Sequence, residues 1–198
     1  KKYHGSFRLI DKEMKRKFKP SEFVFVQDMS DLFADTVPDD LILSIFNHIE
    51  RFPKTKFLLQ TKNPERYINL ASSIPQNCIL GTTIETNYDL FDTPSQYRDY
   101  AEISRAPFPI ERFWALEFLK DLSTFSHDIF ISIEPILDFD KESIEFLKAI
   151  KPWAVAVGYD NYGHKLPEPP LDKTLKLIEE LEKFTKVYRK TLRRAWYE

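Results

Sequence analysis

Residues 56–83 read KFLLQTKNPERYINLASSIPQNCILGTT. Two apolar runs, 56–60 and 78–83, flank a helical pattern that begins at Pro64. Proline suits the first turn of a helix, because its missing N–H would have no partner there. Both runs are nearly continuously apolar, which is typical of parallel strands that are covered on both faces. The stretch therefore predicts one strand–helix–strand unit of a parallel sheet.

The same alternation continues along the chain on both sides of this unit. Further strands are expected at 23–27, 128–133, 153–157 and 185–190, and helices at 39–51, 64–73, 109–122, 141–150 and 171–184. Repeated strand–helix–strand units predict right-handed crossovers and a mostly parallel sheet. A complete eight-unit barrel needs ~250 residues, and this chain has 198. We therefore expect a single α/β domain over 1–198, a partial, TIM-barrel-like (β/α) barrel of about six parallel strands; an open doubly wound sheet is the alternative.

A long polar stretch at 88–109 follows the third expected strand. Connections of this length are uncommon in compact domains and are often lids or binding loops. The sequence leaves two interpretations of this insertion loop open, a functional loop and an ordinary solvated connection.

Composition excludes several classes of protein. The 29 Lys and Arg residues are balanced by 31 Asp and Glu residues, so no overall positive field favours nucleic acid, although a local basic patch is compatible with these numbers. No run reaches the ~18 apolar residues that a membrane helix needs. The single cysteine, Cys78, cannot form a disulfide framework or a metal centre by itself. We expect a soluble, cytoplasmic protein with no membrane partner.

Polar residues follow every expected strand. In parallel α/β folds ligands bind beyond the carboxyl ends of the strands, where the connecting loops converge. Each such residue alone has an ordinary explanation, as a helix cap, a turn or a surface charge. Together they predict a polar pocket with charges of both signs. The sequence has no phosphate-binding glycine loop, no HExxH zinc motif and no nucleophile elbow.

Four segments together resemble a known family. They are VQDMSDLF (26–33), LQTKNPER (59–66), LGTTIE (80–85) and FISIEPIL (130–137). In order and spacing they resemble a phage- and prokaryote-associated, poorly characterised family of radical S-adenosylmethionine-like proteins. The helical segment 107–122, which contains Arg112, is similar to a helix of spore photoproduct lyase and its relatives.

The resemblance implies a partial barrel that holds S-adenosylmethionine and a four-iron four-sulfur cluster, and that generates a 5′-deoxyadenosyl radical on an unknown substrate. The CxxxCxxC cluster loop of the family is absent from this sequence, and thiolates are needed to hold such a cluster. Because the chain starts at Lys1 without Met, we expect the cluster segment to precede it in the intact protein. The six strands would then be the second to seventh of the barrel. The alternative is a member that has lost the cluster.

The resemblance also assigns roles at the strand ends. The residues it places at the cofactor are Asp28, Ser30, Asp31, Thr61, Lys62, Thr83, Glu85, Arg112, Ser132 and Glu134. Arg112 would pair with a carboxylate, since its guanidinium donates two parallel hydrogen bonds. Asn161, Lys190 and Arg193 would face the substrate, which can be a small molecule or a nucleic acid. No residue of this chain is assigned as a cluster ligand or as a catalytic group.

Two other functions compete with this one. The first is a nucleotide or nucleic-acid binding module without catalysis, which would use the polar strand ends together with Arg193, Arg194 and Trp196. The second is a hydrolase in which carboxylates hold Mg²⁺ or Mn²⁺. Its oxygen ligands would be Asp28, Asp31, Glu85 and Glu134.

Overall fold

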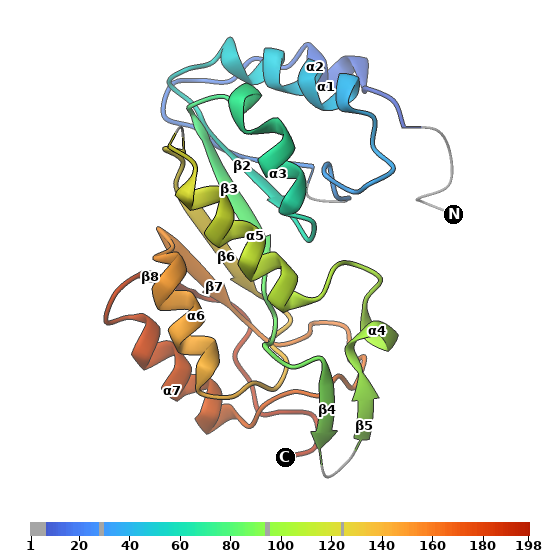
Figure 1. Ribbon diagram of the computed structural model, residues 1–198, viewed down its shortest axis with the longest axis vertical. Helices are drawn as coiled ribbons and strands as arrows, with labels where there is room; N and C mark the ends of the chain where they lie inside the picture. Colours follow the sequence, from blue (N-terminus) through green and yellow to red (C-terminus); the bar gives the residue numbers. More distant parts are fainter. Residues whose placement is uncertain (1–6, 28–29, 94–95, 124) are drawn as a thin grey trace.

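The computed structural model describes residues 7–27, 30–93, 96–123 and 125–198. Its main sheet consists of β1 (Phe23–Val26), β2 (Lys56–Thr61), β3 (Cys78–Thr83), β6 (Ile129–Ile133), β7 (Ala154–Val157) and β8 (Lys186–Arg189). These six strands are parallel and lie side by side in chain order (Figure 1). The sheet is curled into a half-barrel, which confirms the predicted partial (β/α) barrel.

Each pair of neighbouring strands is connected through a helix. These helices are α2 (Asp39–Glu50), α3 (Glu65–Leu70, continued by the 3₁₀ turn η1, Ala71–Ser73), α5 (Pro109–Asp121), α6 (Glu142–Ile150) and α7 (Leu171–Leu181). All five fall within the predicted ranges. A short helix, α1 (Asp11–Met14), precedes β1 and was not predicted.

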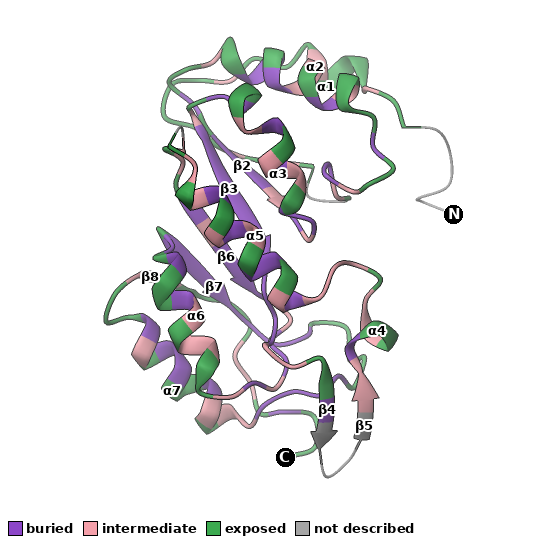
Figure 2. Cartoon of the chain, in the orientation of Figure 1, coloured by how far each residue is buried: buried purple, intermediate pink, exposed green. Residues whose placement is uncertain are grey.

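The helices cover the convex face of the sheet (Figure 1). On α2 the apolar side chains recur every three or four residues, so that Ile42, Phe46 and Ile49 are all buried. They pack into one core with every second residue of the strands, including Leu59 on β2 and Ile131 on β6. Figure 2 shows this burial along the strands and on the sheet-facing sides of the helices. Each fully buried residue of this kind contributes about 1.5–3 kcal/mol to folding.

The alternate residues of the strands point to the concave face, which the helices leave uncovered. The inner strands β3 and β7 are buried along their whole length, whereas the edge strands β1 and β8 are partly exposed. The side-chain period of two in a strand separates the two faces. The concave face is therefore the surface on which a ligand can reach the sheet.

The insertion at 88–109 has secondary structure of its own. It contains an antiparallel hairpin of β4 (Leu90–Thr93) and β5 (Gln96–Asp99), followed by α4 (Tyr100–Ile103). A small apolar cluster of Phe91, Tyr100, Leu137 and Leu166 packs this segment against the loops that follow β6 and β7. The sequence predicted only a loop here, because these strands are too short to show a clear alternation of apolar and polar residues.

Among the described residues, the structure contains no helix with the length and apolar character needed to cross a membrane.

Candidate binding site

The concave face forms a large cavity of about 1350 Å³. Its walls come from β1, β2, β6, β7 and β8 and from the loop after β7. Pockets for drug-sized ligands usually measure about 300–1,000 Å³. The cavity is therefore large enough for more than one small molecule.

Four predicted site residues lie together in this cavity. They are Ser132, Glu134, Asn161 and Lys190, from the carboxyl ends of β6, β7 and β8. Asn161 Oδ1 accepts a 2.7 Å hydrogen bond from the Thr191 hydroxyl. Asn161 Nδ2 lies 3.5 Å from Glu134 Oε1, which is the long limit of a hydrogen bond. The Glu134 carboxylate therefore keeps most of its acceptor capacity for a ligand.

Gly158 brings Glu134 and Lys190 close to each other. A Cβ atom added to Gly158 would lie 2.7 Å from Lys190 Cβ and 3.4 Å from Glu134 Oε1. The first distance is shorter than a real carbon–carbon contact, so only glycine allows the chain after β8 to approach β7 this closely. The carboxylate and the ammonium consequently share one end of the cavity.

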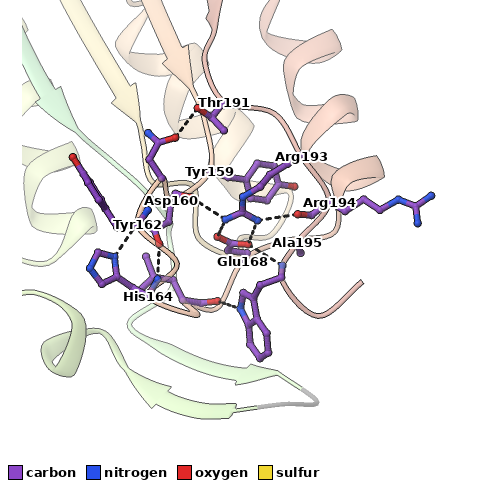
Figure 3. A network of polar contacts seen from close by, with 12 residues as sticks. Tyr159, Asp160, Tyr162, His164, Glu168, Thr191, Arg193, Arg194 and Ala195 are labelled. Carbon is purple, nitrogen blue, oxygen red and sulfur yellow. Dashed lines mark hydrogen bonds and ion pairs between the residues drawn. The ribbon is translucent and has the colours of Figure 1, made fainter.

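The loop after β7 adds a second polar pair to the cavity wall. Figure 3 shows the Asp160 side chain held by the residues that follow it. Its carboxylate accepts hydrogen bonds from the backbone N–H groups of Tyr162 (3.1 Å) and His164 (2.7 Å), and lies 3.0 Å from His164 Nδ1. Burial alone would raise the pKa of Asp160, but these hydrogen bonds hold it below its usual value. Asp160 therefore fixes this loop and orients His164.

Arg193 was predicted to face the substrate, and the structure places it in an internal ion pair. Its guanidinium donates to both Glu168 carboxylate oxygens, at 2.8 and 2.6 Å (Figure 3). It also donates to the backbone carbonyl of Asp160. Glu168 is buried and accepts a further hydrogen bond from the Trp196 backbone N–H. Arg193 thus ties the C-terminal segment to the loop after β7.

A buried ion cluster occupies the carboxyl end of β3. Arg112 donates to Glu85 Oε2 at 2.7 Å, and Tyr100 donates to Glu85 Oε1 at 2.8 Å. Lys62 Nζ lies 2.5 Å from Glu85 Oε1, and Arg112 also donates to the Thr83 carbonyl. Burial raises the pKa of Glu85, but the positive charges of Lys62 and Arg112 outweigh it and lower the pKa below its usual value. The carboxylate that pairs with Arg112 in the structure is therefore that of Glu85, a residue of the same chain.

Asp31 joins the loop after β1 to the end of β2. Its carboxylate accepts 2.9 Å hydrogen bonds from the Thr61 hydroxyl and from the backbone N–H groups of Phe33 and Lys62. Ser30 is exposed and accepts a hydrogen bond from Gln27. Asp28 lies outside the described residues.

The predicted cofactor residues therefore divide into three groups. Ser132 and Glu134 lie in the cavity, and Thr83 is linked to it because Gln60, which lines the cavity, donates to the Thr83 hydroxyl at 3.2 Å. The second group is the ion cluster, and the third is the loop anchor at Asp31. The site residues assigned from the sequence do not include Gly158, Tyr188, Glu168 or the Asp160–His164 pair. Of these, Tyr188 has a readable signal, because it alternates with Lys186 and Lys190 along one strand.

The described residues of this chain do not provide the ligands of an iron–sulfur cluster. Cys78 is buried at the start of β3, and burial raises the pKa of its thiol to about 12. Within the described ranges no group of three or more His, Cys, Asp or Glu side chains could hold a metal ion. The Asp31 and Glu85 carboxylates, which Lys62 connects, accept hydrogen bonds from groups of this chain, whereas Glu134 contacts Asn161. These three carboxylates therefore do not form the ligand set that a metal-dependent hydrolase requires.

Comparison with known protein families gives a match over the first half of the chain. A model of the family described as Protein of unknown function (DUF5131) matches residues 5–108, just over half of the chain. The chain belongs to the DUF5131 family. The match spans β1 to β5 of the DUF5131 chain and ends before α5. No curated protein and no solved structure matches it.

Proposed function

We propose that this chain is the S-adenosylmethionine-binding half-barrel of a radical S-adenosylmethionine enzyme. The observation that carries the proposal is the cavity on the concave face, with Ser132 and Glu134 at the carboxyl ends of its strands. A half-barrel with its ligand site at this edge is the architecture that the resemblance implies. The same edge is where parallel α/β folds bind ligands in general.

The chemistry of the cavity suits this cofactor. S-adenosylmethionine carries a sulfonium and an ammonium group, so a carboxylate is the natural partner for its positive end. Glu134 is half-buried, and its side chain has only the long contact with Asn161 among the described residues. Ser132 is buried beside it, and its hydroxyl can both donate to and accept from a polar group of the cofactor.

The proposal concerns cofactor binding by this chain. Cleavage of the cofactor, as the resemblance implies it, needs a cluster held by thiolates, and the residues of this chain do not supply them. Any such thiolates would come from outside the sequence described.

Calorimetric titration of the chain with S-adenosylmethionine tests the proposal. We expect saturable binding to one site, weakened at least tenfold by Glu134→Gln, because the amide removes the negative charge. Glu145→Gln is the matched control, since Glu145 is an exposed carboxylate on α6 that pairs only with Lys148 among the described residues. Absence of binding, or equal affinity of the Glu134→Gln variant and the unaltered chain, would overturn the proposal.

A further inference from the structure

Two side chains of the edge strand β8 and one from the residue after it form a stripe. Lys186, Tyr188 and Lys190 occupy alternate positions, and Val187 between them packs against the core and also reaches the cavity lining. Lys186 Nζ lies 4.6 Å from the centre of the Tyr188 ring, which confirms that these two side chains share a face. Tyr188 and Lys190 line the cavity, and Lys186 is linked to it through its contact with the Tyr188 ring.

Both ammonium groups of the stripe are available to a ligand. Neither Lys186 nor Lys190 takes part in an ion pair in the part of the chain that the structure describes. In contrast, Arg189 on the same strand pairs with Glu182 at 2.8 Å. The two lysines therefore create a positive edge on a chain whose overall charge is −2.

Exposed aromatic side chains line the cavity from both edges of the sheet, with Trp153 before β7 and Tyr188 on β8 at one edge and Phe23 and Phe25 on β1 at the other. Phe23 is 54% exposed, Phe25 46%, Trp153 40% and Tyr188 37%, and all four line the cavity. Large aromatic side chains gathered on one concave surface indicate a binding site for a ring or another apolar group. Cations beside aromatic rings can bind a ligand that has an anionic group at one end and a planar ring at the other. The cations pair with the anionic group, and the aromatic side chains contact the ring.

We propose that the stripe of Lys186, Tyr188 and Lys190 binds a small molecule with a phosphate group and a planar ring, such as a nucleoside monophosphate. The phosphate contacts the lysines, and the ring packs against Tyr188, at the edge of the sheet where Trp153 also lines the cavity. The inference extends the proposed function, because this ligand would be the substrate that shares the cavity with the cofactor at Ser132 and Glu134. The cavity volume of about 1350 Å³ allows both to bind.

Titration of the full chain with uridine monophosphate tests the inference without the cofactor. A pyrimidine is chosen because it does not imitate the adenine of S-adenosylmethionine. We expect saturable binding that weakens with added salt, and at least tenfold weaker binding of uridine and of inorganic phosphate. Quenching of Trp153 fluorescence provides a second readout, with Trp153→Phe as its control.

Substitutions in the stripe, compared with one at a lysine elsewhere on the surface, test whether the stripe binds the nucleotide. Lys186→Gln combined with Lys190→Gln should weaken nucleotide binding at least tenfold, and Tyr188→Leu should weaken binding of the ring. Lys176→Gln on α7 is the matched control and should bind normally, because Lys176 pairs with Asp172 on the helix surface. Glu134→Gln should weaken binding of S-adenosylmethionine and should not weaken binding of uridine monophosphate, because it removes a negative charge from the end of the cavity that holds Lys190. Failure of one proposal is therefore distinguishable from failure of the other.

Several results would overturn the inference. They are no binding of uridine monophosphate at about 1 mM, full affinity in the double lysine variant, and equal affinity for uridine and its monophosphate. Tight binding of a single-stranded oligonucleotide without binding of the mononucleotide would also overturn it, because the occupant would then be a nucleic acid.

Discussion

The guanidinium of Arg112 lies 2.7 Å from a carboxylate oxygen of Glu85, and both side chains are buried. The pair joins α5 to the carboxyl end of β3, and Tyr100 connects it to the segment that carries the hairpin. A buried charge requires a partner, because transfer from water into the protein interior is costly. The pair therefore holds three parts of the chain in a fixed relation to the sheet.

Replacing Arg112 with Met should destabilise the fold by about 3–5 kcal/mol, because it removes the fully buried one of the two cationic partners of a buried carboxylate. Urea unfolding followed by circular dichroism measures this change. Lys148→Met, which breaks an exposed pair on α6, is the control and should cost at most about 1 kcal/mol. Equal effects of the two substitutions would contradict a structural role for the buried pair.

Acid should destabilise the chain through Glu85 and Asp160. The pKa of each carboxyl is lowered in the folded state, so the unfolded state binds more protons in acid. Their contribution is fully present above the unfolded pKa values, about 4.3 for Glu and 3.9 for Asp. It is lost as the pH falls through the lower, folded values. Urea midpoints measured from pH 7 to pH 2 should show this loss.

The variant Glu85→Gln identifies the group responsible. Its stability should fall less steeply with decreasing pH than that of the unaltered chain, because the amide does not titrate. The same slope in both proteins would show that Glu85 does not contribute to the acid transition.

Two adjacent arginines should behave differently when they are neutralised. Arg193→Gln should destabilise the chain by about 3 kcal/mol, the lower end of the range for buried pairs, because 33% of the Arg193 side chain stays exposed. Arg194→Gln should change stability by about 0.5 kcal/mol or less, since its side chain is exposed. Thermal unfolding of both variants measures the difference. Similar stabilities would contradict the anchoring role of Arg193.

Sequence reasoning succeeded where the signal is local. The six main strands were predictable because each is a short run of apolar, β-branched or aromatic residues, and the five connecting helices because their apolar residues recur with the helical period. The shared position of Glu134, Asn161 and Lys190 was also predictable, since each follows a strand whose carboxyl end must reach the same edge of the sheet. These inferences need no knowledge of distant contacts.

Whether a given charged residue stabilises the fold or faces a ligand could not be predicted in the same way. Glu85 and Arg112 are far apart in the sequence, and Glu168 pairs with Arg193 from an irregular loop. No periodicity connects such partners, so a carboxylate that serves the fold looks the same in the sequence as one that faces a ligand. Only the folded chain shows that Glu134 keeps its acceptor capacity whereas Glu85 does not.

Gly158 gives the most direct test of how the cavity is built. Gly158→Ala would place a Cβ 2.7 Å from Lys190 Cβ and 3.2 Å from the backbone nitrogen of Thr191. The chain after β8 would have to move away from β7, and overpacking of this kind costs about 1–3 kcal/mol. Urea unfolding measures the cost, and titration with uridine monophosphate should show weaker binding, because Lys190 moves.

The Lys190→Gly substitution isolates the clash. It removes the atom that Gly158→Ala would meet first, so the double variant should lose less stability than the two single variants together, by about 0.5–3 kcal/mol. The contact with the Thr191 backbone remains in the double variant, which limits the recovery. Strictly additive losses would show that the approach of β8 to β7 does not depend on the missing side chain at Gly158.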